Sequence, residues 1–180
     1  EQAKRRAKGG EMTPDEIDLI VVGTCTPDKV IPATATIVQR RLGIKGCPAL
    51  DLNAACSGFL YGLDYANRYF RTGGATKALV IGAETLSRIT NWEDRTTAVL
   101  FGDGAGAVVL DASDDPGVLA THIHANGEFE ELLHTSGGIS LGFDASCDRD
   151  GYVRMEGNAV FKRAVATFDS IARETVADLE

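Results

Sequence analysis

Short apolar runs alternate with segments of helical periodicity, and this alternation limits the possible folds more than any other feature of the sequence. Ile17–Thr24 is a nearly continuous apolar run, which indicates a strand buried on both faces. Further strands are predicted at Ala49–Asn53 and Lys77–Glu84, with helices at Thr34–Leu42 and Cys56–Thr72. This order predicts an α/β fold in which right-handed crossovers place helices over a sheet.

Local signals mark where several of these elements begin and end. Thr13-Pro14-Asp15-Glu16 matches a capping box with proline at the first helical position, and it predicts one short turn. The helix that starts at Thr34 is predicted to stop at Gly43. The next helix is predicted to stop at Gly73-Gly74, because glycine readily adopts the left-handed conformation that ends helices.

The second half of the sequence is less regular. Ala98–Leu110 is apolar at both ends around a glycine-rich centre, and Val118–Ala125 is predicted to form another strand that closes in an Asn126-Gly127 turn. Glu128–Gly151 is long and polar, which is typical of a surface loop. A helix is predicted from about Asn158, because the apolar residues that follow form one helical stripe. These residues are Phe161, Val165, Phe168, Ile171, Ala172, Val176 and Leu179.

Two motifs could suggest a bound ligand, but neither fits its pattern. Gly102–Gly106 resembles a phosphate loop, yet the strand-like Ala107–Leu110 follows it, whereas a dinucleotide fingerprint opens a helix. His122 and His124 lie two apart and therefore on one face of a predicted strand, with no third ligand nearby in sequence. We therefore predict neither nucleotide binding at the glycines nor a metal site at the histidines.

Ser113–Gly117 is the best candidate for a domain boundary. It combines acidic residues, proline and glycine between two predicted strands. We therefore expect one part over residues 1–115 and a second over residues 116–180.

Composition narrows the class of protein. The 180 residues are 44% hydrophobic and 24% charged, as in an ordinary globular protein, and the net charge of −8 argues against a nucleic-acid surface. The basic residues Lys4, Arg5, Arg6 and Lys8 are interpreted as a solvated helix face. No apolar run approaches the roughly 20 residues that a membrane span needs. Neither nucleic acid nor membrane is therefore expected as a partner.

The first residues are not expected to form a signal peptide, and the cysteines indicate a reducing setting. Cys25, Cys47, Cys56 and Cys147 form no Cys-x-x-Cys pair and are too sparse for a disulfide scaffold. A cytoplasmic location is therefore expected.

Cys56 is the candidate catalytic residue, because it lies where a predicted buried strand turns into a helix. The free N–H groups and the dipole at a helix start favour negative charge and stabilise a thiolate there. A sharp strand-to-helix turn also lifts a side chain toward a substrate, as in hydrolases that use a nucleophilic serine. On this local pattern alone, a buried structural cysteine remains an open alternative.

Five motifs in order resemble the β-ketoacyl-acyl carrier protein synthase III family, whose members initiate fatty-acid synthesis. The motifs are Asp18–Val22, Thr26-Pro27-Asp28, Ala54–Phe59, Asp94–Gly106 and Met155–Phe161. The resemblance runs from Ile17 essentially to Glu180. It implies a thiolase-like α/β fold with a mixed five-stranded sheet, helices on both faces and two duplicated halves. Residues 1–115 would hold most of the first half, and residues 116–180 the opening of an incomplete second half.

The resemblance also implies a reaction. Cys56 would attack a short acyl-CoA, such as acetyl-CoA, and carry its acyl group. A malonyl-acyl carrier protein would then lose carbon dioxide, and its carbanion would attack the acyl-enzyme to give 3-oxoacyl-acyl carrier protein. Coenzyme A enters as part of the substrate, and no cofactor or metal is implied. Members of the family usually work as homodimers.

The family also uses a histidine and an asparagine that stabilise the developing enolate oxygen. Their motifs have no counterpart here, and none of the three histidines should be promoted to that role. We therefore expect an internal fragment that lacks the family's N-terminal start and the C-terminal catalytic region, and that does not condense substrates on its own.

Six further residues match family positions near the substrate, and each has a plainer interpretation. Arg95 would contact the CoA nucleotide, or it could pair with Asp94 or Glu93. Asn158 and Phe161 would line the pantetheine channel, although Phe161 also fits the helical stripe. The acyl pocket would take its wall from the remaining three, each of which could equally be an ordinary apolar residue. These are Ile31, which would reach across a dimer, Leu86 and Phe101.

Two alternative functions stay open. The chain could belong to a related cysteine-dependent starter synthase or acyl thiohydrolase that uses another acceptor. It could also be a non-catalytic truncated subunit that dimerises.

Overall fold

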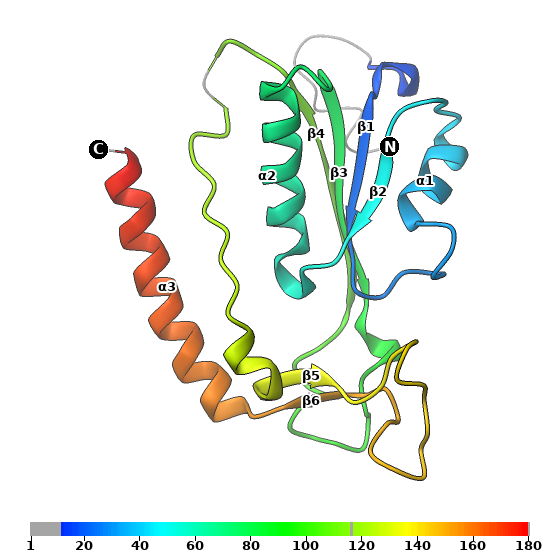
Figure 1. Ribbon diagram of the computed structural model, residues 1–180, viewed down its shortest axis with the longest axis vertical. Helices are drawn as coiled ribbons and strands as arrows, with labels where there is room; N and C mark the ends of the chain where they lie inside the picture. Colours follow the sequence, from blue (N-terminus) through cyan, green and yellow to red (C-terminus); the bar gives the residue numbers. More distant parts are fainter. Residues whose placement is uncertain (1–11, 116, 180) are drawn as a thin grey trace. The chain divides into compact units, whose positions relative to one another are not determined.

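The computed structural model describes residues 12–115 and 117–179 (Figure 1), which form two units. The basic residues at 4–8 lie outside this range. One unit comprises residues up to Glu84 together with Gly104–Thr121, and the other comprises Thr85–Asp103 together with the chain from His122 onward. Each unit is described separately below.

A four-stranded sheet forms the centre of the first unit, in the order β2-β1-β3-β4. β1 pairs in parallel with both β2 and β3, so that Val22 lies opposite Asp51 on one side and Ile81 on the other. Five strands were expected, and the described residues form four of them. The strands are β1 (Leu19–Gly23), β2 (Ala49–Leu52), β3 (Lys77–Thr85) and β4 (Asp103–Asp111).

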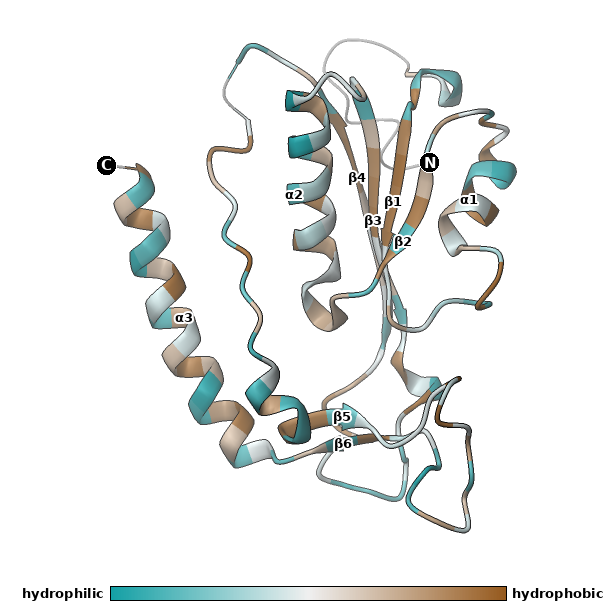
Figure 2. Cartoon of the chain, viewed as in Figure 1, coloured by the Kyte–Doolittle hydropathy of each residue, from teal (hydrophilic) through white to brown (hydrophobic). Residues whose placement is uncertain are grey.

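The two helices of the first unit, α1 (Thr34–Leu42) and α2 (Gly58–Arg71), cover opposite faces of this sheet (Figure 1). All five residues of β1 are buried, and Figure 2 shows apolar residues along the strand. On one face, Ile20 and Val22 belong to a core cluster with Ala35 of α1. On the other face, Leu19 and Val21 belong to a cluster with Ala66 of α2. The prediction of a strand buried on both faces is confirmed.

Local signals predicted several boundaries correctly. α1 spans the predicted residues and ends at Gly43, whose φ of +75° requires the left-handed region. Gly73, with φ of +72°, ends α2 in the same way. The predicted capping box is formed, because Thr13 N–H donates to Glu16 Oε1 at 3.1 Å beside the short helix η2 (Pro14–Glu16).

The second unit contains two short strands and one long helix. β5 (Leu133–Thr135) and β6 (Val153–Met155) pair antiparallel, and α3 (Gly157–Leu179) follows β6. Two 3-10 helices, η4 (Leu86–Arg88) and η5 (Gly127–Leu132), lie in the same unit. Helix α3 confirms the prediction near Asn158, and Figure 2 shows apolar and polar residues mixed along it.

Two predicted elements differ from the structure. Val118–Ala125 is not a strand: the segment has no regular secondary structure, and side chains within it bind helices. In the first unit, the Thr121 hydroxyl donates a hydrogen bond to Asp64 of α2. In the second unit, His124 Nε2 lies 2.8 Å from Glu174 Oε2 of α3. Glu128–Gly151 is not one loop, since it contains most of η5 and all of β5.

Only the second part of Ala98–Leu110 forms a strand, β4. Strand geometry begins only at Asp103, because hydrogen-bonded turns occupy the preceding residues. Asp94 anchors these turns: its carbonyl oxygen accepts from the N–H groups of Thr97 and Ala98.

Candidate active site at the start of helix α2

Cys56 lies in a tight turn between β2 and α2, as predicted, but the α-helix begins two residues later than expected. Residues Ala55–Ser57 form a separate 3-10 turn, η3, and α2 starts at Gly58. Ala55 has a φ of +46°, the only positive φ among the described non-glycine residues. Such a conformation is strained for a residue with a Cβ atom and tends to occur at functional sites. The Cys56 side chain that follows is exposed.

Two hydrogen bonds hold the backbone of this turn. The Asn53 side-chain oxygen accepts from Ala55 N–H at 3.1 Å, and Ala54 carbonyl oxygen accepts from Ser57 N–H at 3.0 Å. The first bond is an Asx-type turn, which an asparagine two residues before the bend can supply. The turn is thus specified locally, by the residues immediately around Cys56.

Small residues let the start of α2 approach the strand ends closely. An ideal Cβ atom on Gly82 of β3 would lie 3.1 Å from Cβ of Phe59, and one on Gly62 would lie 3.0 Å from Val80 Cγ1. These distances leave little or no room for larger side chains. The glycines therefore fix the position of the helix start, and with it the position of Cys56.

A carboxylate network lies at the ends of β1 and β3, in the same unit as Cys56. Glu84 accepts hydrogen bonds from Cys25 N–H at 2.9 Å, from Thr26 Oγ1 at 2.5 Å and from Thr24 Oγ1 at 3.4 Å. The Cys25 thiol donates to Glu84 Oε2 at 3.4 Å. One side chain thus organises the whole turn that follows β1.

Burial, followed by the charge of Glu84, the hydrogen bond to Glu84 and the interaction with Cys56, raises the pKa of the Cys25 thiol to about 11. A thiol with this pKa is almost entirely protonated near neutral pH and is a poor nucleophile. The two cysteines of this region therefore differ in setting: Cys25 is half-buried beside a carboxylate, and Cys56 is exposed on the helix turn.

Sequence reasoning missed Cys25 and Glu84, although the register of the sheet could have found them. Gly23 of β1 lies opposite Gly82 of β3 in parallel register. Residues two positions beyond each glycine therefore emerge at the same edge of the sheet. A polar Thr-Cys-Thr triplet after one buried strand and a glutamate at the end of its neighbour were the available signal.

The other predicted site residues are divided between the two units. Ile31 lies in the first unit, is 83% exposed and precedes Pro32 through a cis peptide bond. The remaining five lie in the second unit. Arg95 and Asn158 are exposed and Phe161 is 69% exposed, whereas Leu86 and Phe101 are partly buried.

Local structure bears on two of the plainer interpretations. The carboxylate of Asp94, a proposed partner of Arg95, accepts from Thr96 Oγ1 at 2.6 Å and from Thr97 Oγ1 at 2.8 Å. The hydrogen bonds from Thr96, then that from Thr97, lower the pKa of Asp94. Phe161 lies on the predicted stripe of α3, but its side chain is exposed.

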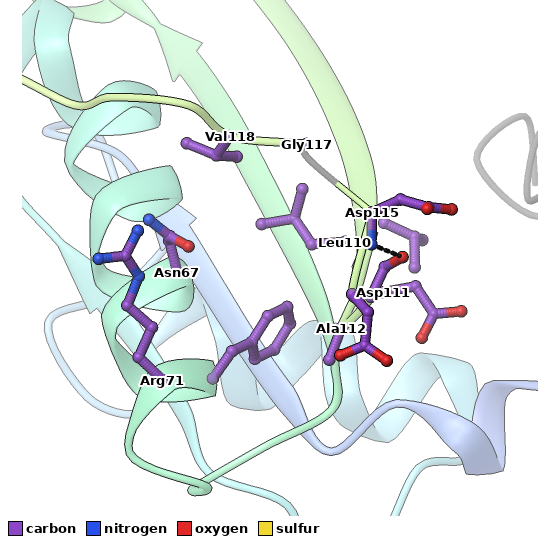
Figure 3. A pocket seen from close by; sticks show the side chains of 12 residues that line it. Asn67, Arg71, Leu110, Asp111, Ala112, Asp115, Gly117 and Val118 are labelled. Carbon is purple, nitrogen blue, oxygen red and sulfur yellow. Dashed lines mark hydrogen bonds between the residues drawn. The ribbon is translucent and has the colours of Figure 1, made fainter. Parts of the chain in front are cut away.

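A separate pocket of about 590 Å³ lies at the far end of α2 (Figure 3). Asn67 and Arg71 of α2 line one side, and Leu110 and Asp111 line the other. A helix of 14 residues is about 20 Å long, so this pocket is remote from Cys56 at the opposite helix end. It is not part of the candidate active site.

The described residues also limit other site types. Among residues 12–115 and 117–179, no three or more His, Cys, Asp or Glu side chains are grouped so that they could hold a metal ion. No helix in that same part of the chain has both the length and the apolar composition for crossing a membrane.

Comparison with known proteins shows similarity over nearly the whole chain. A family described as 3-oxoacyl-[acyl-carrier-protein (ACP)] synthase III matches residues 50–127, which include Cys56. The sequence is 55% identical over 178 residues to a β-ketoacyl-[acyl-carrier-protein] synthase III of Thioalkalivibrio sulfidiphilus, covering 98% of this chain and 55% of that protein. The chain therefore spans about half the length of the curated relatives it matches.

Solved structures give the same result. The crystal structure of 3-oxoacyl-[acyl-carrier-protein] synthase III from Aquifex aeolicus is similar with a TM-score of 0.82 and 47% identity, over 93% of this chain and 51% of that one. The priming β-ketosynthase of the R1128 polyketide pathway is similar with a TM-score of 0.84 and 34% identity, over 90% of this chain and 48% of that one. The expectation of a thiolase-like α/β fold is confirmed by these neighbours.

Proposed function

Because this chain belongs to the β-ketoacyl-[acyl-carrier-protein] synthase III family, we propose that it carries the acyl-accepting half of a condensing enzyme, with Cys56 as the residue that is acylated. One observation supports this most strongly. An exposed cysteine follows a strained residue at the turn from β2 into α2, within the region matched to the family. Nucleophilic residues are commonly presented on such strand-to-helix turns.

The proposed reaction has two steps. Cys56 Sγ attacks the thioester carbonyl of a short acyl-CoA such as acetyl-CoA, a new carbon–sulfur bond forms, and coenzyme A leaves as its thiol. Malonyl-acyl carrier protein then loses carbon dioxide, and the resulting carbanion attacks the acyl group on Cys56. The product is 3-oxoacyl-acyl carrier protein, and Cys56 is regenerated. Coenzyme A takes part as substrate, and the reaction needs no metal.

We assign supporting roles to the other residues by their family resemblance. Arg95 would bind the phosphates of the CoA nucleotide, since a guanidinium suits such groups. Asn158 and Phe161 would line the channel of the pantetheine arm. The wall of the acyl pocket would come from Leu86, Phe101 and, across a dimer interface, Ile31, whose 83% exposure is consistent with contact to a second subunit.

A homodimer in the cytoplasm is the proposed setting. β2 is an edge strand of the described sheet, so one side of it is available for pairing with another chain. Within the sequence, residues 1–115 would belong to the first thiolase-like half and residues 116–180 to the opening of the second.

A second candidate is a starter synthase with a different acceptor. The similarity to a priming β-ketosynthase of a polyketide pathway, at 34% identity, favours this alternative specifically. Acylation of Cys56 is common to both candidates, and the acceptor distinguishes them. Incubating the acylated protein with malonyl-acyl carrier protein or with other malonyl thioesters would identify the acceptor.

Intact-mass measurement after incubation with acetyl-CoA tests the central proposal. The protein expressed from its full reading frame should gain one acetyl group, and Cys56→Ala should gain none. Cys147→Ala is the matched control, because Cys147 is also an exposed free thiol but lies in the other unit. An adduct that survives in Cys56→Ala, or its absence from folded wild type, would show that the proposed nucleophile is wrong.

A further inference from the structure

Two thiols lie beyond the same end of the sheet. β1 and β2 run parallel with Gly23 opposite Leu52, and Thr24 N–H donates to the Leu52 carbonyl at 3.1 Å. The chain leaves β1 toward Cys25 and leaves β2 toward Cys56, so both cysteines lie beyond the same end of the sheet. The charge of Cys56 also acts on Cys25, after the larger effects of burial and Glu84.

The two thiols would compete for any thioester that reaches this edge. Both are free, and neither takes part in a disulfide. A thioester reacts with a thiolate, not with a thiol, so the state of protonation decides which cysteine is acylated. A condensing enzyme needs the acyl group on one defined atom, because the second substrate must meet it in a fixed geometry.

Burial has the largest effect on the pKa of the Cys25 thiol, and Glu84 is the charged group that adds most to it. Its carboxylate receives both the N–H and the S–H of Cys25, at 2.9 Å and 3.4 Å. The same carboxylate is held by Thr24 and Thr26, so its position against the Cys25 sulfur is fixed by three neighbouring residues in the loop after β1. A fixed negative charge beside a thiol opposes loss of the thiol proton.

We propose that Glu84 makes acylation selective for Cys56: its carboxylate holds the adjacent Cys25 as a protonated thiol, so that only one of two neighbouring thiols accepts the acyl group. This inference rests on the proposed acylation of Cys56. Glu84 acts through Cys25 and touches no substrate, which makes it a positioning residue. Glu84 and Cys56 are the titratable groups that act on the Cys25 sulfur.

The competing step that Glu84 suppresses is a simple acyl transfer. The Cys25 proton would pass to solvent, and the thiolate would attack the thioester carbonyl. A carbon–sulfur bond to Cys25 would form as the bond to coenzyme A breaks, and coenzyme A would leave and take up a proton. The acyl group would then be on the half-buried Cys25 sulfur instead of on the exposed Cys56.

Peptide-level mass spectrometry of iodoacetamide alkylation tests this inference without any acyl substrate. In wild type at pH 8, Cys56 should be alkylated while Cys25 stays unmodified, since roughly one thiol in a thousand is ionised at that pH when the pKa is about 11. In Glu84→Gln, the alkylation rate of Cys25 should rise by about tenfold, and its pH profile should move toward lower pH by about one unit.

The pH profile separates loss of charge from loosening of the turn. A turn that merely opened would raise the alkylation rate at every pH without moving the midpoint. Thr26→Val provides the matched control, because it removes the 2.5 Å hydrogen bond to Glu84 but leaves the carboxylate charged. Its Cys25 profile should keep the wild-type midpoint.

Two results would overturn the inference. One is a Glu84→Gln profile for Cys25 that matches wild type in rate and midpoint. The other is a Thr26→Val variant that shifts the midpoint as far as Glu84→Gln does. Incubation with acetyl-CoA completes the test: Glu84→Gln should carry acetyl groups on both cysteines. If wild type takes no acetyl group on Cys56, the proposed function fails, while the alkylation result still decides the role of Glu84.

Discussion

The backbone of Gly23 at the end of β1 lies directly against the backbone of Gly58 at the start of α2. An ideal Cβ atom on Gly23 would lie 2.5 Å from the Gly58 carbonyl carbon and 2.8 Å from the Phe59 nitrogen. Real Cβ atoms do not approach backbone atoms so closely. Either the end of β1 or the start of α2 must therefore move to accept a side chain at residue 23. The position of the helix start next to Cys56 therefore depends on the absence of a side chain at residue 23.

We expect Gly23→Ala to damage both stability and acylation. The forced shift should lower the free energy of unfolding by about 1–3 kcal/mol, as is usual for overpacking. Displacing the Cys56 turn should slow acetylation of Cys56 by about a hundredfold, since small misplacements of a reacting group cost this much. Urea unfolding and single-turnover acetylation measure the two effects.

Gly127→Ala serves as the control for this experiment. A Cβ atom there would have no neighbour within 4 Å, and its backbone needs no left-handed φ. It should change neither the unfolding free energy nor the acetylation rate. If Gly23→Ala behaves like Gly127→Ala, the close backbone contact is not what positions the turn.

Asp51 of β2 provides the first acceptors for helix α1. Its two oxygens accept from Thr34 N–H at 2.7 Å and from Ala35 N–H at 2.8 Å. Asp51→Ala would leave both amides without this acceptor, so the free energy of unfolding should fall by about 1–2 kcal/mol. Asp51→Asn keeps one oxygen and should lose less than Asp51→Ala. Equal losses in the two variants, measured by urea unfolding, would contradict this capping role.

Local features of the sequence predicted much of the fold, because they depend on neighbouring residues alone. Helix α1 has the predicted bounds, since Gly43 after it marks a left-handed stop. The start of α2 was predicted two residues early, because the strained φ of Ala55 has no signature in the side chains around it.

Features that depend on distant residues could not be predicted in this way. Cys56 was a candidate from its own motif, whereas Cys25 and Glu84 are brought together only by the register of β1 and β3 across 59 positions of sequence. The same reason explains the wrong strand at Val118–Ala125. Thr121 in this segment binds Asp64, which lies 57 positions earlier in the sequence, and a local pattern does not reveal such a bond.

Asp150 should give the second unit a dependence on acidic pH. Hydrogen bonds from Ser136 Oγ at 2.7 Å and Arg154 Nη2 at 2.6 Å, followed by the N–H of Tyr152, lower the pKa of Asp150 from 3.8 to about 2. A carboxyl with a lowered pKa in the folded protein stabilises the fold above its unfolded pKa. That stabilisation should be lost as the pH falls from about 4 to about 2.

NMR titration of the carboxyl carbons measures this effect. The Asp150 resonance should titrate with a midpoint near 2, and Tyr152 amide protection should fall over the same pH range. Asp150→Asn should abolish the pH dependence of that protection. Asp148→Asn, which removes an exposed carboxylate from the same loop, should leave it in place. A midpoint for Asp150 near 4 would show that these hydrogen bonds do not persist in solution.

Asp64 on α2 is buried, and it depends on Thr121 for one of its hydrogen bonds. The Asp64 side chain is 6% exposed and accepts from Arg68 Nε at 2.7 Å and from the Thr121 hydroxyl. The hydrogen bond from Arg68 lowers the pKa of Asp64 against the opposing effect of burial, and the bond from Thr121 lowers it further. Thr121 therefore joins the irregular chain after β4 to α2, the helix that follows the Cys56 turn.

Thr121→Val should remove this connection while keeping the shape of the side chain. A buried carboxylate that loses a donor costs about 1–3 kcal/mol, so the free energy of unfolding should fall by this amount. Amide exchange at residues 118–121 should accelerate, because the hydroxyl anchors that segment to α2. Thr121→Ser retains the hydroxyl and should stay within about 0.5 kcal/mol of wild type. If serine destabilises as much as valine, the methyl packing of Thr121, and not its bond to Asp64, holds the segment.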